Sequence, residues 1–105
     1  MNEDKSGIRI VLHAPSAASL SRARSNVANL VNGDREINVR IVVNAGAVAV
    51  VLDEPDVVAD PLTLICPNSL KKISRSAGTP LTVLPEAGVL ALARMQADGW
   101  HYVRA

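Results

Sequence analysis

Aromatic side chains are almost absent from this chain, which has 105 residues, one tryptophan, one tyrosine and no phenylalanine. Trp100 and Tyr102 lie together near the C-terminus, so no row of rings is available on which nucleic-acid bases would stack. An excess of charge of one sign is also lacking, because 11 Lys and Arg face 10 Asp and Glu, for a net charge of +1. Nucleic acid is therefore not an expected partner.

Long apolar runs and paired cysteines are missing as well. No stretch approaches the roughly 20 apolar residues that a membrane-spanning helix requires, and residues 1–7 lack the features of a secretory signal. The single cysteine, Cys66, cannot form an internal disulfide, which is typical of a reducing compartment. We therefore expect a cytoplasmic protein without membrane contact, in which residues 1–7 are loosely ordered and residues 8–105 form one domain.

Strand-like and helix-like segments alternate along the whole chain. Runs rich in β-branched residues predict strands at 8–13, 37–43, 62–65, 81–84 and 100–104. Apolar residues at helical spacing predict helices between Ser16 and Asn32, at 68–77 with Gly78 as its C-terminal cap, and at 86–97. In the last helix, Val89, Leu92, Ala93 and Gln96 lie along one side. The alternation predicts an α/β fold, a three-layer α/β/α sandwich around a mostly parallel five-stranded sheet.

Residues 47–52 (Ala-Val-Ala-Val-Val-Leu) fit either a helix or a strand by pattern alone. Gly46 before the segment and Asp53-Glu54-Pro55 after it favour a short helix. Such a helix would be apolar on nearly all sides and would need cover from more than one direction. In so small a chain, we expect part of that cover to come from another subunit of a homo-oligomer.

Three polar or reactive side chains, His13, Asn44 and Cys66, stand at or just after the ends of predicted strands. Parallel strands place their carboxyl ends at one edge of the sheet, where α/β folds bind ligands. Cys66 precedes a proline suited to the first helical position, so its sulfur would face free N–H groups that favour the thiolate. A thiolate attacks sulfur, which makes Cys66 the candidate catalytic residue. The alternative is a buried cysteine that serves as a small apolar side chain.

The turns at this edge supply further candidates for the border of a site. His13 is a candidate proton shuttle, or else a hydrogen-bonded side chain that closes the first strand. Asn44 and Gly46 fit a turn, since asparagine tolerates unusual backbone angles and glycine allows close approach. Binding of a ligand by Asn44 and Gly46 is the alternative. His101 is expected to pack beside the two aromatic side chains.

The predicted helix after Cys66 contributes the remaining candidates. Asn68 and Ser69 can cap free N–H groups of its first turn, or border the site. Lys71 and Lys72 fit a solvated face, or a surface that docks an acidic partner. Two histidines and one cysteine without ligand spacing do not indicate a metal site, and no glycine-rich spacing indicates a nucleotide. We expect neither a metal nor an organic cofactor.

The segment Cys66-Pro67-Asn68-Ser69-Leu70 resembles the Cys-x-Asn-Ser/Thr-Leu motif of a small bacterial and archaeal branch of the DsrE/DsrF-like (YchN-like) family. Other similar segments are Leu12-His13, Asn44 to Val48, Val83 to Val89 and Met95 to Val103. The resemblance covers nearly everything after Gly7. It implies a three-layer α/β/α fold with a five-stranded parallel sheet, assembled as trimers or hexamers.

The resemblance also implies a function for the cysteine. In the better-understood branches of the family, a cysteine at the position of Cys66 carries sulfur as a persulfide between donor and acceptor proteins. Cys66 would thus belong to a sulfurtransferase-like relay. Pro67 departs from the pattern, since a small or polar residue is expected there and proline lacks an N–H that could support a thiolate. The alternative, from another class, is a non-catalytic oligomeric module that binds a small ligand or a partner and contains a structural cysteine.

Overall fold

The computed structural model describes residues 7–105, and their strands form one five-stranded sheet in the order β4-β3-β2-β1-β5. All neighbouring strands are parallel. The strands are β1 (Arg9–Ala14), β2 (Asn38–Val43), β3 (Thr63–Ile65), β4 (Thr82–Val83) and β5 (His101–Arg104). The predicted fold class is confirmed. The prediction for the N-terminus falls, apart from Gly7, outside the described residues.

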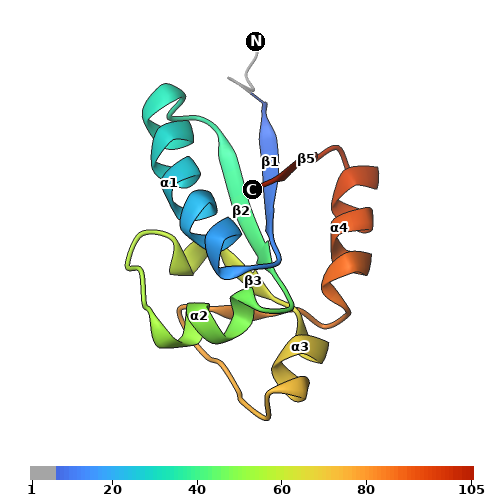
Figure 1. The fold of residues 1–105 in the computed structure, drawn as a ribbon. Helices are drawn as coiled ribbons and strands as arrows, with labels where there is room; N and C mark the ends of the chain where they lie inside the picture. Colours follow the sequence, from blue (N-terminus) through green and yellow to red (C-terminus); the bar gives the residue numbers. More distant parts are fainter. Residues whose placement is uncertain (1–6) are drawn as a thin grey trace.

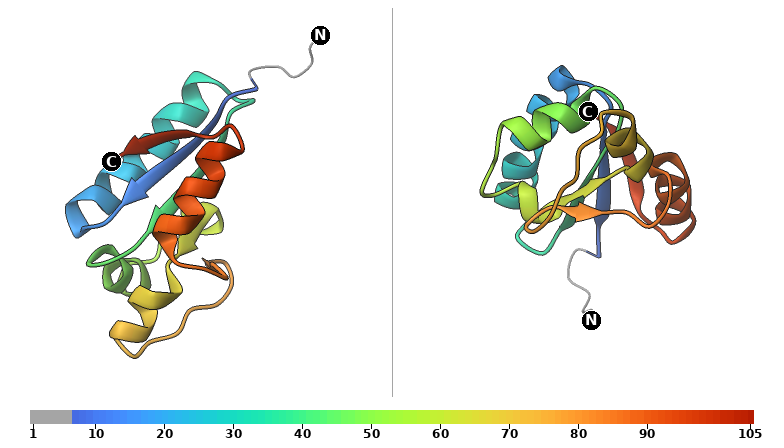
Figure 2. Two further views of the ribbon diagram at one scale, coloured as in Figure 1. Left: turned by 90° about the vertical axis from the view of Figure 1, so that its right-hand side faces the viewer. Right: turned by 90° about the horizontal axis from the view of Figure 1, so that it is seen from below.

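Helices complete the three layers (Figures 1 and 2). They are α1 (Ala17–Gly33), α2 (Ala47–Asp53), α3 (Pro67–Lys72) and α4 (Gly88–Ala97), with a short 3-10 helix η1 (Asp60–Leu62). Helices α1 and α2 cover one face of the sheet and α4 covers the other, whereas α3 lies beyond the carboxyl ends of the strands. None of the described helices has the length and apolar content needed to cross a membrane.

The longest helix, α1, begins at a side-chain cap and buries one apolar stripe. The Ser16 hydroxyl accepts a hydrogen bond from the Ser19 N–H at 3.1 Å, which satisfies one of the free donors of the first turn. Leu20, Ala23 and Val27 then recur on the side that faces the sheet, and all three are buried. They belong to the larger of two apolar cores, which α1 and α2 form with one face of the strands.

The core under α4 is smaller, and its buried members are Val11, Val42 and Leu92. Of the four residues predicted along one side of α4, only Leu92 is buried; Val89 is 70% exposed. The buried side of α4 instead consists of Gly88, Ala91 and Leu92, with Met95 packed against it. The predicted apolar side of α4 was therefore wrong: the side that is buried is rotated about the helix axis by part of a turn from the predicted one. A single helix thus covers this face of the sheet, and its first residue lies beside Cys66.

The prediction of a helix at residues 47–52 is confirmed by α2. Ala47, Val48 and Val51 are buried, while Val50 and Leu52 are partly buried against the same core. The cover that we expected from another subunit is supplied within the chain, because α2 packs between α1 and α3. The apolar composition of α2 is therefore no argument for an oligomer.

Helix α3 ends at Lys72, five residues before the predicted end, so Gly78 is not its cap. Ser74 has a φ of +55°, a left-handed conformation that the helix cannot continue through. The chain then turns back under α2, where the Arg75 guanidinium lies 2.9 Å from the Asp53 carboxylate. The early end of α3 therefore lets Arg75 form an ion pair with Asp53, a residue far away in the sequence.

Candidate functional site

The structure brings His13, Asn44 and Cys66 to one edge of the sheet. In the register of β2 and β3, Val43 pairs with Ile65, and the Cys66 N–H donates to the Val43 carbonyl at 3.0 Å. Asn44 and Cys66 therefore leave neighbouring strands side by side. His13 lies one strand further along, paired with Val42 in the register of β1 and β2. The parallel order of the strands thus places these residues together despite their separation in sequence.

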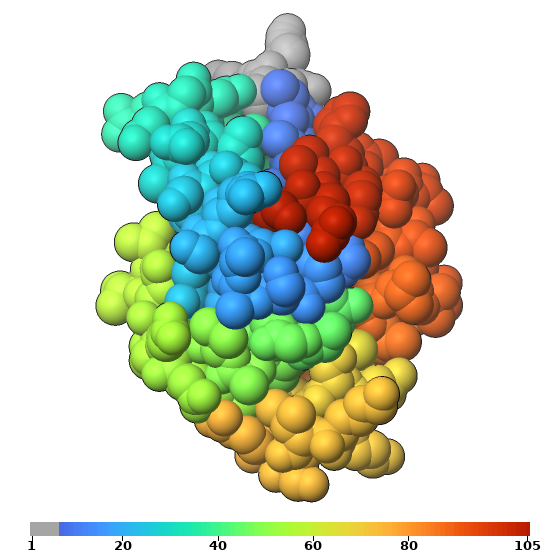
Figure 3. Space-filling view, viewed as in Figure 1, coloured from blue at the N-terminus to red at the C-terminus, as the bar shows by residue number. Residues whose placement is uncertain are grey.

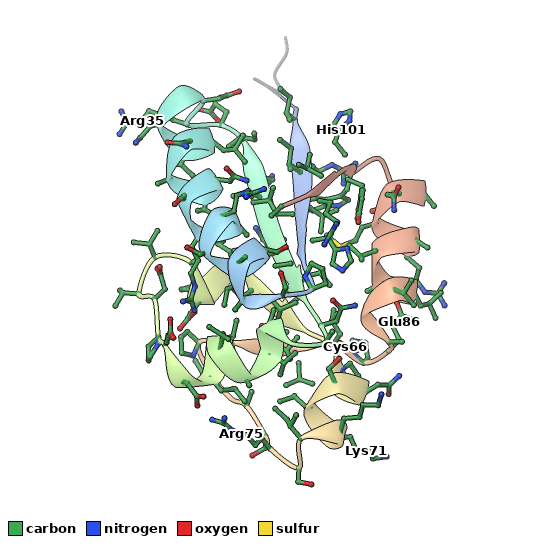
Figure 4. All side chains as sticks on the ribbon, in the orientation of Figure 1. Arg35, Cys66, Lys71, Arg75, Glu86 and His101 are labelled. Carbon is green, nitrogen blue, oxygen red and sulfur yellow. The ribbon has the colours of Figure 1, made fainter. Side chains whose placement is uncertain are left out.

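Cys66 lies where the N-termini of α3 and α4 converge (Figure 4). It is the N-cap residue of α3, and the Gly88 N–H of the first turn of α4 donates to its Sγ at 3.3 Å. A β-carbon at Gly88 would lie 3.2 Å from the Cys66 Cβ and 3.7 Å from Sγ. Gly88 therefore packs directly on the thiol, and Cys66 is only 5% exposed.

Burial raises the pKa of the Cys66 thiol, but hydrogen bonds from Gly88, Ser69 and Asn68 outweigh that effect. The donors are three backbone N–H groups, one from each of these residues, and the Ser69 hydroxyl. The pKa of Cys66 is therefore lowered from its ordinary value, as expected for a sulfur held at helix N-termini. The donor that Pro67 lacks is replaced by the N–H groups of the two residues after it.

The Ser69 side chain links Cys66 to the turn after β2. Its Oγ accepts a hydrogen bond from the Ala45 N–H at 2.9 Å, which leaves the hydroxyl proton free to bond the sulfur. Ala45 has a φ of +50°, so the left-handed residue of the turn is neither Asn44 nor Gly46. Gly46 has a φ of −65° and is the N-cap of α2. The role of Ala45 could not be predicted from the sequence, because alanine carries no signal for this conformation.

We expect Ala45→Gly to raise the free energy of unfolding by about 0.5–1 kcal/mol. An alanine in the left-handed conformation costs roughly 1–2 kcal/mol, and glycine avoids this cost. Part of the gain is lost again, because glycine makes the unfolded chain more flexible. Urea unfolding measures the change. The matched control is Ala49→Gly in the middle of α2, which should lower the free energy of unfolding by about 0.5–1 kcal/mol. Equal losses in both variants would contradict a strained turn at Ala45.

His13 is held from both sides of its ring. Its Nε2 lies 3.0 Å from the Asn44 Oδ1, and its Nδ1 lies 2.7 Å from the Tyr102 hydroxyl. Both ring nitrogens of His13 therefore have a hydrogen-bond partner, one of which, the Asn44 amide oxygen, can only accept. This arrangement fits the alternative of a hydrogen-bonded histidine at the strand end. The contact between Tyr102 and His13 could not be predicted from the sequence, since only the register of β5 on β1 brings the two side chains together.

The predicted docking lysines lie apart from the thiol. Lys71 and Lys72 are exposed in the last turn of α3, and Lys71 points away from the molecule (Figure 4). His101 is exposed on β5. Within residues 7–105, no three His, Cys, Asp or Glu side chains lie close enough to hold a metal ion.

Comparisons with known proteins add no assignment to this geometry. No model of a known protein family matches the chain, and no curated protein sequence is significantly similar to it. The chemistry of the edge around Cys66 is therefore argued from its own contacts.

The lowered pKa of Cys66 predicts a pH-dependent contribution to stability. A folded thiol with a lowered pKa ionises before the unfolded thiol, whose pKa is about 8.5. The pH-dependent part of the stability difference between the wild type and Cys66→Ser should therefore be absent below the folded pKa. It should grow as pH rises toward about 8.5 and then stay constant. Urea unfolding of both proteins from about pH 5 to about pH 9.5 measures this difference. A difference that is flat with pH would show that the folded thiol does not ionise early.

Proposed function

We propose that Cys66 accepts sulfane sulfur from a donor protein and passes it on to an acceptor protein in the cytoplasm. The observation that carries this proposal is the position of Sγ at the N-termini of α3 and α4, where the Gly88 N–H donates to it at 3.3 Å and the pKa of the thiol is lowered despite its burial. Thiolate character is what sulfur exchange requires. The resemblance of the Cys66–Leu70 segment to a persulfide-carrying family supports the same chemistry.

The proposed reaction consists of two exchanges at sulfur. In the first, the Cys66 thiolate attacks the outer sulfur of a donor persulfide; the new S–S bond forms as the old one breaks. The donor leaves as a thiolate with the electron pair of the broken bond, and Cys66 becomes a persulfide. In the second, an acceptor thiolate attacks the outer sulfur on Cys66 and releases the Cys66 thiolate. No net oxidation occurs, and no organic cofactor takes part.

Access to the sulfur is the condition that this reaction must meet. Gly88 packs on Cys66, so a donor reaches Sγ only when the first turn of α4 moves aside. The N–H groups of Asn68 and Ser69, which stay in place on α3, would then stabilise the negative charge of the persulfide. We propose that His13, through its hydrogen bonds to Asn44 and Tyr102, keeps the ends of β2 and β5 in place during the exchange.

Intact-protein mass after incubation with inorganic polysulfide tests the proposal. We expect the wild type to gain about 32 Da per sulfur atom at Cys66, and Cys66→Ser to gain nothing. Ser69→Ala removes one donor from Sγ, so it should gain sulfur several-fold more slowly near neutral pH. Ser76→Ala, an exposed serine in the following loop, is the matched control and should behave like the wild type. A wild-type protein that gains no sulfur would overturn the proposal.

The second candidate function is a non-catalytic binding module in which Cys66 is structural. Its supporting observation is the 5% exposure of Cys66. In this case the row formed by Tyr102, His13 and Asn44 would contact a small ligand or a partner. Cys66→Ala distinguishes the two functions, because a binding module retains its partner without the thiol, whereas a sulfur relay loses all transfer.

A further inference from the structure

The segment between α2 and η1 holds two valines in the solvent. Val57 is 90% exposed and Val58 is 68% exposed. The Asp56 Oδ1 accepts from the N–H groups of Val58 and Ala59 at 3.0 and 2.9 Å, so the backbone that carries the valines is fixed. A fixed turn cannot fold its apolar side chains back into the core. These side chains are therefore available to a partner.

The surroundings of the two valines are acidic. Among the described residues, Asp56 and Asp60 both form their ion pair with the same cation, Arg24. The exposed Glu54 adds a third carboxylate, so carboxylates outnumber cations here. A hollow of about 270 Å³ beside the turn is lined in part by Arg24, Glu54 and Asp56, and it has room for a cationic side chain. We name Glu54, Asp56, Val57 and Val58 the acidic loop.

The end of α3 has the opposite character. Lys71 and Lys72 are exposed in the last helical turn, and Ile73 beside them is 38% exposed. Among the described residues neither lysine forms an ion pair, whereas nearby Arg75 is taken by Asp53. We name Lys71, Lys72 and Ile73 the basic end. It offers cations next to an apolar side chain, and the acidic loop offers carboxylates next to apolar side chains.

The two surfaces lie on different sides of the molecule. In Figure 3 the segment around residue 57 (yellow-green) forms the left border, whereas α3 (gold) lies at the lower right. They therefore do not meet within one chain. We infer that the acidic loop of one copy binds the basic end of a second copy. Because the contact joins two different surfaces, it is heterologous and leads to a closed ring when its rotation closes.

This inference does not depend on sulfur chemistry at Cys66. It specifies the acidic partner of Lys71 and Lys72 as a second copy of the chain itself. It also leaves the thiol and the row at His13 outside the contact. A failure of sulfur transfer and a failure of assembly would therefore be recognised separately.

Sedimentation equilibrium at about 100 µM chain in low salt tests the inference. The wild type should have a mass of two or more chains, and higher salt should lower that mass by screening the charges. Lys71→Glu with Lys72→Glu should be monomeric, and so should Val57→Ser with Val58→Ser, which removes the apolar contact without changing the charge of the acidic loop. Arg22→Glu with Arg35→Glu is the control; it makes the same charge change as the lysine variant on exposed residues of α1 and the following turn and should assemble like the wild type.

A mixture of the two monomeric variants gives the sharpest result. The intact basic end of the valine variant can bind the intact acidic loop of the lysine variant, whereas the two altered surfaces repel. We therefore expect a one-to-one dimer and no larger species. All altered residues are exposed, so circular dichroism should match the wild type. A monomeric wild type, an assembly that persists in both variants, or a mixture that stays monomeric would overturn the inference.

Discussion

Gly88→Val is expected to lower the free energy of unfolding by about 2–3 kcal/mol and to expose the Cys66 thiol. A β-carbon at residue 88 would lie 3.2 Å from the Cys66 Cβ, closer than an ordinary contact, and the larger valine side chain would also press on Val42, whose Cγ1 is 3.5 Å from that β-carbon. Both neighbours belong to the end of the sheet and cannot move away cheaply. The first turn of α4 should yield instead, and it should take the Gly88 N–H away from Sγ.

Two measurements check this expectation. Urea unfolding gives the stability, and the plateau rate of Cys66 alkylation at high pH, where the rate no longer rises with pH because the thiol is fully ionised, reports access alone. We expect faster alkylation than in the wild type. The control is Gly78→Val, since a β-carbon there meets nothing within 4 Å and stability should change by no more than about 0.5 kcal/mol. Unchanged stability and access in Gly88→Val would show that Gly88 does not cover the thiol.

The sheet could be predicted because each strand is marked by its own residues. β-Branched runs separated by helical spacing are local signals, and the alternation alone calls for parallel strands. Parallel strands in turn place His13, Asn44 and Cys66 at one edge without knowledge of any contact. The starts of α1 and α3 could be predicted for the same reason, because Ser16 and Pro67 are local signals for the beginning of a helix.

Contacts between distant segments could not be predicted in the same way. Tyr102 reaches His13 only because β5 pairs with β1, and Gly88 reaches Cys66 only because α4 begins above the end of β3. The rotation of α4 is a related case. The spacing of Val89 and Ala93 fits an apolar side of the helix, but the side that faces the sheet is set by how α4 packs on it. Ala91 and Leu92 are buried there, and Met95 packs against the same core. The burial of Cys66 likewise depends on that helix.

Asp60→Ala is expected to lower the free energy of unfolding by about 3 kcal/mol, because it leaves a largely buried arginine without its closest partner. The Arg24 Nη2 donates to the Asp60 Oδ1 at 3.3 Å, and the two side chains are only 14% and 7% exposed. The Arg24 Nε has no hydrogen-bond partner in the described structure, and it lies 4.0 Å from the Asp56 Oδ2. Asp60 also accepts from the Asp56 N–H at 3.1 Å, so its loss frees the acidic loop as well.

The exposed pair of Asp53 and Arg75 provides the comparison. Its nitrogen–oxygen distance is shorter, 2.9 Å, but the side chains are 61% and 41% exposed. Asp53→Ala should therefore cost less than about 1 kcal/mol, since water solvates the arginine left behind. Replacing both buried partners, Asp60→Ala with Arg24→Met, should recover part of the loss because no buried charge remains unpaired. If Asp60→Ala cost no more than Asp53→Ala in urea unfolding, Arg24 would have to be reaching solvent or another carboxylate. The acidic loop would then not be anchored to α1 through Asp60, and the fixed display of Val57 and Val58 on which self-association depends would lose its main support.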